Sequence, residues 1–320
     1  MNTAPASRVT IVVVSYNVCA LLRQCLSSAV AAKPPAQVIV VDNASHDGSV
    51  EMVRREFPTV MLIANKRNRG FAAGTNQGLC HALAADLPSD YVLLLNPDAF
   101  LRRGALAAMV EFMDEHPRVG AVGARLFYPD GRPQEGAWHF PTLWMTLLDL
   151  FPPRGPLLGR LYASSLNGRY REERGSDPFP IDHPLGAAML LRRTTLEQVG
   201  LLDEGYWMYV EEVDWCYRCR QAGWAIWQVP SAEVVHVAGA SSQQFKGRSF
   251  VALHRSRLRF FAKLGSPRRE RWNRRIVRAG MLWAALSAWR DRLRGRIGVE
   301  ELRSRLLAYG QVLRLARGDD

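Results

Sequence analysis

Residues 91–98 read Tyr-Val-Leu-Leu-Leu-Asn-Pro-Asp, a short apolar run that stops at a proline and a carboxylate. Such a run predicts a strand that is covered on both faces in a parallel sheet. Pro97 offers no backbone donor, so the strand ends before it. Asp98 then lies just outside the carboxyl edge of the sheet, where open α/β folds bind ligands. It is a candidate oxygen ligand for a divalent cation that carries phosphates; the alternative is an aspartate that caps a turn or helix.

Strand and helix signals alternate around this stretch. Short apolar, β-branched runs predict strands, and amphipathic segments bounded by turn residues predict helices. The predicted strands span residues 9–14, 37–41, 60–64 and 91–95, and the predicted helices span residues 20–32, 49–57 and 70–85. The alternation predicts βαβ units and therefore an α/β fold, with a mainly parallel central sheet flanked by helices, of the nucleotide-binding kind.

The pattern changes after Gly120. Residues 127–131 (FYPDG) predict a hairpin turn. Residues 138–184 are rich in proline, glycine and aromatic residues, which predicts a mobile loop or lid with short helices. Beyond them, the sequence predicts strands at 187–191, 226–229 and 233–237 and helices at 194–199 and 210–222.

Charge divides the chain into two parts. The net charge is +12, yet residues 246–320 contain 20 Lys and Arg against 6 Asp and Glu, which leaves 22 against 24 for residues 1–245. We therefore expect a main domain over residues 1–245 and a basic helical extension over residues 246–320. An anionic partner fits the extension, either a membrane surface or a nucleic acid.

Composition indicates a cytoplasmic protein. Mean hydropathy is −0.13, and no apolar run approaches the roughly 20 residues that span a bilayer. Residues 1–8 lack the apolar core of a signal peptide. The five cysteines are odd in number and scattered, which indicates reduced thiols.

Polar residues also follow the second predicted strand and precede the third predicted helix. Asp42 opens a strand-to-helix turn over residues 42–49, where a carboxylate can accept hydrogen bonds from a ribose or a base. The alternative is a helix-capping turn without a ligand. Residues 68–76 (NRGFAAGTN) place glycines at a helix start, which permits a ligand to approach the backbone closely.

Two further groups carry candidate chemistry. Residues 211–214 (EEVD) set three carboxylates beside the aromatic segment 206–209. Partial desolvation there raises a carboxyl pKa, as a general base near neutrality requires; the alternative is a charged first turn favoured by the helix dipole. His236 ends a predicted strand. A lone histidine is commonly structural, whereas this one can complete the coordination that Asp98 begins.

In this order the motifs resemble those of family 2 glycosyltransferases of the GT-A fold, and among them the bacterial rhamnosyltransferase branch. The motifs are VVSYN (13–17), VVDNASHDGS (40–49), NRGFAAGTN (68–76), LLLNPD (93–98), EEVDWCYR (211–218) and VVHVAGASS (234–242). The resemblance covers roughly residues 8–260. It implies that residues 1–245 are a GT-A catalytic domain that uses a nucleotide-sugar donor and a divalent metal, Mg or Mn, and inverts the anomeric carbon.

The resemblance also implies roles for single residues. Asp42 would contact the nucleoside, and Asp98 would hold the metal that bridges the diphosphate, assisted by His236. The remaining donor-binding candidates are Ser15, Asn17, Asn43, Gly70, Asn76, Asn96 and Asp214. The acidic pair would supply the base.

Two positions depart from the family pattern. Asn96 stands where the metal motif often has its first aspartate, which leaves fewer anionic ligands. Glu211-Glu212 stands where Glu-Asp is usual. The favoured base is therefore Glu212, one methylene longer than the usual residue, and Glu211 is the alternative.

The sequence thus predicts an inverting glycosyltransferase of cell-surface polysaccharide synthesis. The favoured donor is dTDP-rhamnose, and the acceptor is a saccharide or a polyprenyl-diphosphate-linked glycan. A sugar nucleotidyltransferase and a basic nucleic-acid-binding protein are the alternatives, although we expect no nucleic-acid partner.

The basic extension is predicted to bind the cytoplasmic face of a membrane. Apolar residues at 258, 260, 261 and 264 and over 276–289, with Trp283 and Trp289, lie among arginines. The alternative is a helical pair packed on the catalytic body or against a second subunit in a homodimer.

Overall fold

The computed structural model of the chain describes residues 7–84, 89–153, 164–170, 175–238 and 246–318. The chain forms two compact units. The first comprises Met1–His139, Tyr170–Trp207 and Glu211–Ser241, and the second comprises Phe140–Arg169, Met208–Val210 and Ser242–Asp320. The predicted domains 1–245 and 246–320 stay a prediction, because compactness does not test which segments fold independently.

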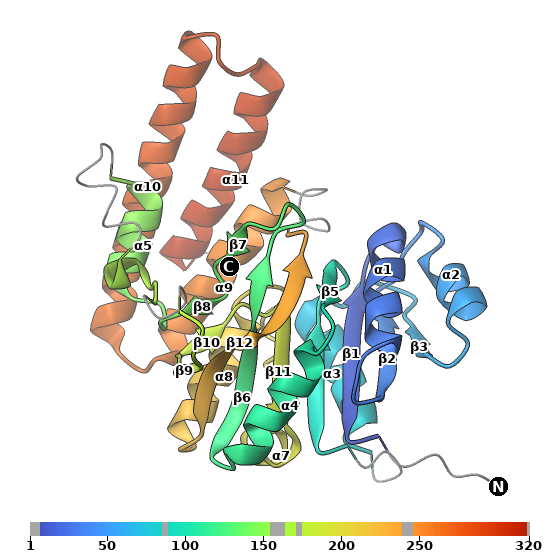
Figure 1. Cartoon of the computed structure of the whole chain (residues 1–320). Coiled ribbons are helices and arrows are strands. Elements are labelled where there is room, and N and C mark those ends of the chain that lie inside the picture. Colours follow the sequence, from blue (N-terminus) through green and yellow to red (C-terminus); the bar gives the residue numbers. More distant parts are fainter. Residues whose placement is uncertain (1–6, 85–88, 154–163, 171–174, 239–245, 319–320) are drawn as a thin grey trace, which may run out of the picture. The chain divides into compact units, whose positions relative to one another are not determined.

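The first unit contains the sheet and the helices that cover it (Figure 1). Its elements are β1 (Val9–Ser15), α1 (Cys19–Val30), β2 (Ala36–Asp42), α2 (Ser49–Glu56), β3 (Met61–Ala64), α3 (Phe71–Ala82), β4 (Tyr91–Leu95), β5 (Ala99–Leu101), α4 (Ala105–Glu115), β6 (Val119–Phe127), β7 (Pro133–Gln134), β8 (Ala137–Trp138), β9 (Phe179–Pro180), β10 (His183–Pro184), β11 (Ala188–Arg192), α7 (Arg193–Val199), α8 (Glu211–Gln221) and β12 (Ala225–His236).

The strand order is β3-β2-β1-β4-β11-β6-β12-β5, and β7 and β9 pair with β6 and β12. The strands β3, β2, β1 and β4 are parallel, as predicted. Next to them, β11 is antiparallel to both β4 and β6, while β12 is parallel to β6. The α/β class and the flanking helices are confirmed. The sheet is mixed, because β11, in the middle of the sheet, runs antiparallel to its neighbours β4 and β6.

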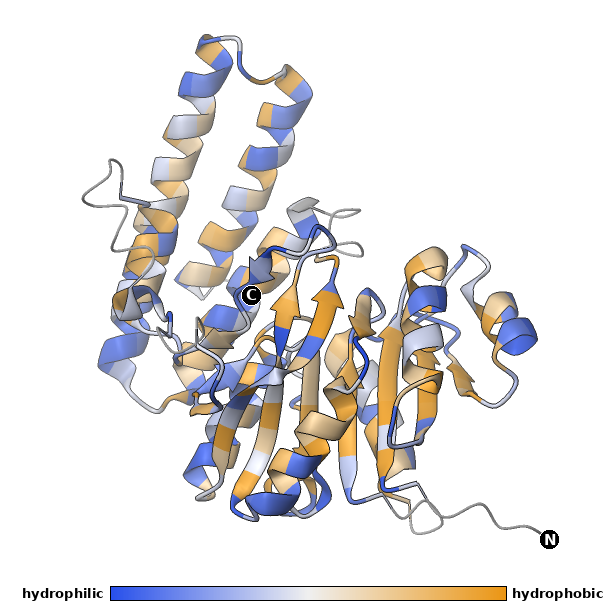
Figure 2. Ribbon diagram, viewed as in Figure 1, coloured by the Kyte–Doolittle hydropathy of each residue, from blue (hydrophilic) through white to orange (hydrophobic). Residues whose placement is uncertain are grey.

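Side-chain alternation along β1 explains the two helical layers. Val9, Ile11 and Val13 belong to the apolar core that includes side chains of α1, α2 and α4. On the opposite face, α3 approaches so closely that a Cβ atom at Gly78 would lie 2.3 Å from Val12 Cγ1. Successive strand residues point to opposite faces of the sheet, so α3 covers the face that α1 and α4 do not cover. Figure 2 shows the resulting apolar strands between helices of mixed polarity.

One strand, β12, replaces the two strands predicted at 226–229 and 233–237. Pro230 lies between them and has no backbone donor, and the pairing with β6 shifts register between Val229 and Glu233. The strand therefore continues through an irregularity that the sequence pattern interprets as a break. The predicted hairpin at 127–131 is confirmed: β6 and β7 are antiparallel, and Tyr128 N–H donates to the Arg132 carbonyl at 2.8 Å.

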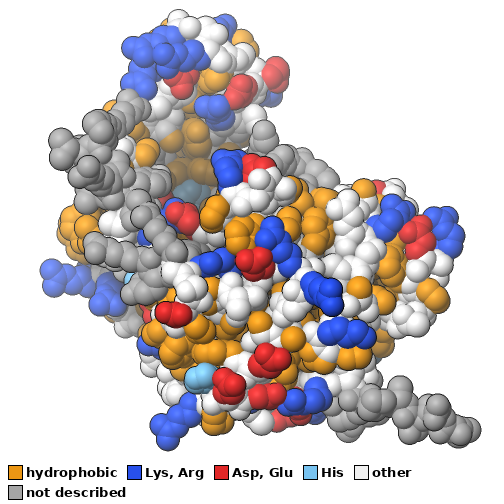
Figure 3. Space-filling model, in the orientation of Figure 1, with side chains coloured by type: hydrophobic (Ala, Val, Ile, Leu, Met, Phe, Trp, Pro, Cys, Tyr) orange, Lys and Arg blue, Asp and Glu red, His pale blue; other side chains and the backbone are white. Residues whose placement is uncertain are grey.

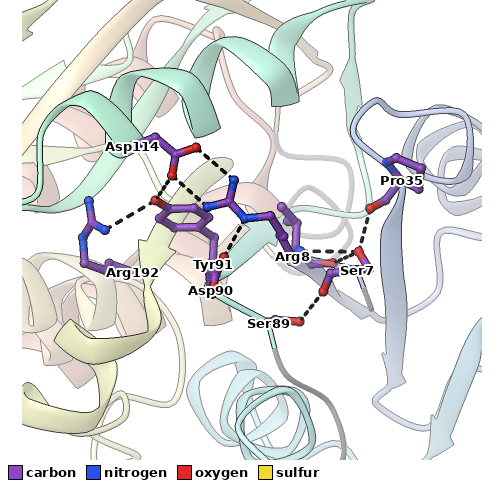
Figure 4. A network of polar contacts seen from close by, with 9 residues as sticks. Ser7, Arg8, Pro35, Ser89, Asp90, Tyr91, Asp114 and Arg192 are labelled. Carbon is purple, nitrogen blue, oxygen red and sulfur yellow. Dashed lines mark hydrogen bonds and ion pairs between the residues drawn. The ribbon is translucent and has the colours of Figure 1, made fainter. Parts of the chain in front are cut away.

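A polar network closes the amino ends of β1 and β4 (Figure 4). Arg8 pairs with Asp90 at 2.6 Å and with Asp114 at 2.9 Å. The Tyr91 hydroxyl donates to Asp114 at 2.6 Å, and Arg192 donates to the same hydroxyl at 3.4 Å. Because this network lies at the opposite ends of the strands from Asp42 and the Asn96–Asp98 segment, it is structural.

The second unit is helical: α5 (Leu143–Leu150), η1 (Ser165–Asn167), α9 (Lys246–Lys263), α10 (Pro267–Leu293) and α11 (Val299–Arg317). Its core contains Leu258, Val277, Met281, Val312, Leu315 and Ala316. Part of the loop predicted at 138–184 belongs to this unit, and its residues 154–163 and 171–174 lie outside the described ones. Within the described ranges, every helix is too short or too polar to cross a membrane.

Candidate active site

The candidate side chains lie along one edge of the sheet. The last residues of β1 and β2, Ser15 and Asp42, are partners in register, and β4 ends beside β1 at Leu95. The antiparallel β11 begins at this edge, since Ala188 pairs with Leu95. The Asn96 N–H donates to the Ala187 carbonyl at 2.9 Å, which fixes the start of the Asn-Pro-Asp segment there.

Asp42 is buried with one carboxylate oxygen uncommitted. Its Oδ1 accepts the Ser45 N–H at 2.8 Å, and its Oδ2 has no hydrogen-bond partner among the described residues. The buried hydroxyl of Ser15, in the neighbouring register position, also has none there. Buried polar atoms are nearly always hydrogen-bonded, so two adjacent exceptions mark a place where a ligand can supply partners. The contact with the nucleoside stays a prediction.

Asn17 and Asn43 hold the loops around this position. Asn17 has a left-handed backbone (φ 52°), and its Oδ1 accepts the His46 N–H at 2.8 Å. The Nδ2 of Asn43 donates to the Gly70 carbonyl at 2.9 Å. Its Oδ1 accepts from Asn65 at 3.0 Å. Both side chains therefore tie together turns that sequence reasoning assigned to donor binding.

Gly70 and Asn76 serve contacts within the chain. Gly70 has φ +86°, and a Cβ atom there would lie 2.5 Å from the Trp207 carbonyl oxygen, to which Phe71 N–H donates at 2.7 Å. The Asn76 amide donates to the Leu202 carbonyl at 2.9 Å and accepts its N–H at 3.0 Å. The close approach predicted at Gly70 is thus made by the chain itself, and donor contacts of either residue stay predictions.

Asp98 and His236 form a buried pair. Ala99 pairs with His236 across β5 and β12, and His236 Nε2 lies 3.4 Å from Asp98 Oδ1. The other ring nitrogen, Nδ1, lies 2.9 Å from Gln134 Oε1. With the glutamine oxygen as acceptor, Nδ1 carries a proton, and in the neutral tautomer of the ring Nε2 presents its lone pair toward Asp98. Two acceptor atoms that face each other fit a cation bound at both.

This pair meets the requirements for a metal bound together with a substrate. No group of three or more His, Cys, Asp and Glu side chains that could hold a metal occurs in the described part of the chain. Mg²⁺ is commonly bound by one or two carboxylates together with substrate phosphates and water. Asp98 and His236 would supply two ligands, and a diphosphate would complete the coordination. The half-buried Asn96 is adjacent, and its carbonyl accepts the Ala99 N–H at 3.0 Å.

The acidic pair begins α8, directly after two residues with left-handed backbone, Tyr209 (φ 70°) and Val210 (φ 71°). Such a conformation is costly for a β-branched residue and is concentrated at functional sites. Burial, and then the neighbouring Glu212 carboxylate, hold the pKa of Glu211 well above its ordinary value. Glu212 is half-buried and packs on the backbone of Gly186, where a Cβ atom would lie 3.3 Å from its Cγ. Since Gly186 precedes β11, Glu212 lies at the same edge as Asn96.

The Asp214 carboxylate is bound by side chains of the protein itself. Its side chain is nearly buried, and Arg218 Nε lies 3.0 Å from Oδ2 while the Tyr206 hydroxyl donates to Oδ1 at 3.2 Å. Arg218 also donates to the carbonyls of Val199 and Leu201, at 2.7 and 2.8 Å. These bonds fasten α8 to the loop after α7, and the predicted role of Asp214 in donor binding stays a prediction.

Sequence reasoning missed Gln134 and Gly186. Gln134 lies just beyond the FYPDG turn, and no sequence signal connects it with His236. Gly186 begins the small-residue run Gly186-Ala187-Ala188 before a predicted strand. Glycine at such a point indicates that something approaches the backbone closely, and this signal was available.

Comparison with known proteins identifies the family of the chain. A sequence model described as glycosyl transferase family 2 matches residues 10–200, more than half of the chain. The chain is 31% identical, over 79% of its length and 83% of the relative, to an N-acetylglucosaminyl-diphospho-decaprenol L-rhamnosyltransferase of Mycobacterium tuberculosis. It is 20% identical, over 66% of its length and 62% of the relative, to the dTDP-rhamnosyl transferase RfbF of Shigella flexneri.

A solved structure also resembles this one. The mannosyltransferase PcManGT from Pyrobaculum calidifontis, in complex with GDP-Man and Mn²⁺, has a TM-score of 0.56 and 18% identity, and the match covers 98% of this chain and 86% of that one. This likeness concerns the fold, which is the GT-A fold expected from the motifs. From the motif order, the matched region and the fold together, the chain belongs to glycosyl transferase family 2, in its rhamnosyltransferase-like branch.

Proposed function

We propose that this glycosyltransferase moves rhamnose from dTDP-rhamnose, with inversion, to a saccharide or a polyprenyl-diphosphate-linked glycan in cell-surface polysaccharide synthesis. The relatives support both substrates, since one is named for a decaprenol-linked acceptor and rhamnose and another for a dTDP-rhamnosyl donor. The observation that carries the reaction type is the placement of Glu212 on Gly186, at the edge where the Asn96–Asp98 segment begins.

The proposed reaction is one displacement. The acceptor oxygen forms a bond to the anomeric carbon from the face opposite the diphosphate, and the bond from that carbon to the diphosphate oxygen breaks. Glu212 accepts the proton of the attacking hydroxyl, which makes the oxygen a better nucleophile. The nucleoside diphosphate leaves with the electron pair of the broken bond. Because the acceptor attacks the donor directly, no covalent enzyme intermediate is needed.

The other residues bind and orient the donor. Asp98 and His236 would hold Mg²⁺ or Mn²⁺, which when bound neutralises negative charge that grows on the diphosphate. Gln134 fixes the His236 ring for this role through the 2.9 Å contact. Asp42, whose Oδ2 has no partner among the described residues, accepts hydrogen bonds from the nucleoside.

Glu212 is the better candidate for the base on grounds of access. Glu211 is almost fully buried, and burial and the Glu212 carboxylate raise its pKa, which makes it harder to ionise than an ordinary glutamate. Glu212 is half-buried as a residue, with its Oε2 buried, so it is the more accessible of the two glutamates, and it packs on Gly186.

A donor screen tests the proposal. Purified protein is mixed with dTDP-, UDP- or GDP-sugars and a lipid-linked acceptor, with Mg²⁺, Mn²⁺ or a chelator, and nucleoside diphosphate release is measured. We expect release from dTDP-rhamnose that depends on acceptor and metal. Faster release from another donor would overturn the donor assignment, and full activity in chelator would overturn the metal assignment.

The proposal includes a place of action. Residues 246–320 would attach the protein to the cytoplasmic face of a membrane, where a polyprenyl-linked acceptor is found, and the charge surplus of this segment supports it. A homodimer through the same segment is the competing arrangement.

A further inference from the structure

We propose that one face of α10 is the surface by which this protein binds bilayers that contain anionic lipids. The face consists of Leu282, Leu286, Trp289 and Leu293 and is called the α10 apolar face below. The inference deepens the proposed function, because it names the attachment surface and the lipid chemistry, and it rests on that function for the membrane-linked acceptor.

The α10 apolar face is continuous and open to solvent. Its side chains are 57%, 66%, 52% and 84% exposed, in chain order. They are spaced by four, three and four residues, which places them on one side of a helix. Trp283, 46% exposed, adjoins this row. Single exposed apolar residues are ordinary, whereas a row of large ones along three turns marks an interaction surface.

The opposite side of α10 accounts for its packing. Val277, Met281 and Ala288 are buried, and the first two belong to the core that also contains Val312 of α11. Gly280 lies against Leu150 of α5, where a Cβ atom would come within 2.8 Å of the leucine side chain. The helix is therefore apolar on two sides, and packing within the unit uses one of them.

The earlier part of the extension does not share this role. Leu258, Phe260 and Phe261 on α9, predicted from the sequence to face a membrane, are 5% exposed or less. Their burial corrects that prediction, because a side chain in the core has no surface left for lipid. These three α9 side chains are thus excluded from the membrane-binding surface.

Arginines border the α10 apolar face at both ends. Arg271, Arg275 and Arg278 are exposed and continue the same row toward the start of the helix. Beyond its end, Arg294 and Arg296 lie in the turn to α11. Figure 3 shows blue Lys and Arg side chains gathered at the end of the unit where α10 and α11 are joined. Leucine and tryptophan between basic side chains are the composition of helices that lie in a membrane interface.

The arginines around the α10 apolar face favour an anionic lipid surface over a second copy of the chain as its binding partner. In a symmetric dimer the same patch meets itself, so the arginines of one copy would approach those of the other. An anionic headgroup layer instead attracts each of them, by an interaction that salt weakens. The α10 apolar face therefore fits an anionic lipid surface better than a second copy of this chain.

Vesicle flotation of the full-length protein tests this. Vesicles of phosphatidylcholine alone are compared with vesicles that also contain phosphatidylglycerol, at low and high salt. The variant L282S/L286S/L293S removes three exposed side chains, and V30S/M61S is the matched control, since Val30 and Met61 are exposed on other elements. We expect salt-sensitive binding to the anionic vesicles only, reduced at least about tenfold in the triple variant and unchanged in the control.

A spectroscopic measurement reports on the face directly. Trp289→Phe should lower the quenching of tryptophan emission by brominated lipid in the anionic vesicles. Equal binding of wild type and triple variant, or no binding by wild type, would overturn the proposal. So would a wild-type dimer in light scattering that the triple variant turns into a monomer. Sugar transfer to a water-soluble acceptor is measured separately. If the wild-type protein floats with anionic vesicles as expected but transfers no sugar, the result contradicts the proposed function and not the membrane surface.

Discussion

Replacing Glu212 and Glu211 separately with glutamine distinguishes the two candidate bases. Glutamine has nearly the shape of glutamate, so Glu212→Gln keeps the packing of Cγ on Gly186, where an added Cβ atom would lie 3.3 Å from that Cγ. What it loses is the ability to accept a proton. General-base catalysis contributes about 10²- to 10⁴-fold. At about 1.4 kcal/mol per factor of ten, the barrier should rise by roughly 3 to 6 kcal/mol, with donor affinity little changed.

Glu211→Gln should act on stability instead. Burial and the charge of Glu212 raise the pKa of Glu211 in the folded protein above the value of 4.5. Because the pKa of Glu211 is higher in the folded protein than in the unfolded chain, the contribution of this group to the free energy of unfolding is complete below pH 4.5. It is lost as the pH rises through the folded pKa. Above that pH the wild type keeps a buried, unfavourable charge, and each pKa unit corresponds to about 1.4 kcal/mol. The variant should therefore be more stable than wild type at neutral to alkaline pH and equal to it at pH 4.

Two measurements decide the matter. Single-turnover release of nucleoside diphosphate, with donor and acceptor both saturating, gives the chemical step, and thermal unfolding between pH 4 and pH 9 gives stability. We expect Glu212→Gln to be slow and normally folded, and Glu211→Gln to be active with a raised Tm at high pH. An inactive Glu211→Gln beside an active Glu212→Gln would show that the base is Glu211.

Three further replacements test neighbouring parts of the site. Asp98→Ala should abolish transfer and leave circular dichroism unchanged; near wild-type turnover with Mg²⁺ or Mn²⁺ would refute the metal assignment. Gln134→Leu should raise the Mn²⁺ concentration for half-maximal turnover, and the Mn²⁺ dissociation constant in the presence of nucleotide, about 10- to 100-fold; unchanged values would show that Gln134 does not position His236. Asp214→Ala leaves Arg218 without its 3.0 Å partner and should lower the free energy of unfolding by about 3 to 5 kcal/mol in denaturant unfolding; an unchanged free energy of unfolding would show that this pair does not stabilise the fold.

The first half of the fold could be predicted because its signals are local. The run at 91–95 becomes β4 with the same bounds, and Asp42 ends β2 as its position after an apolar run indicates. Each of these segments is identified by its own residues, since apolar runs and turn residues determine where a parallel strand begins and ends. The reversal at β11 could not be predicted in this way, because its direction depends on pairing with both β4 and β6.

The candidate residues could be named from the sequence, but their contacts could not. Asp98 and His236 were matched by resemblance, yet their 3.4 Å separation depends on β5 pairing with β12. Asn76 and Asp214 were assigned to the donor, whereas in the structure they bond residues of the loop after α7 and of α8. A polar side chain in a motif can equally bind a ligand or hold the loop that does, and the spacing is the same in either case.

The position of Glu212 on the sheet follows from a pattern that the sequence contains. Residues four and seven positions further along a helix share its face, and these are Cys216 and Cys219, both fully buried. Cys216 lies 3.9 Å from Met189 of β11, sulfur to sulfur. One turn earlier on α8, and just before β11 begins, Glu212 must therefore meet Gly186. Glu211 is rotated about 100° from this face, toward the side of Trp215, which is also fully buried. The spacing therefore accounts for the contact of Glu212 with Gly186, while the choice of Glu212 as the base stays a prediction.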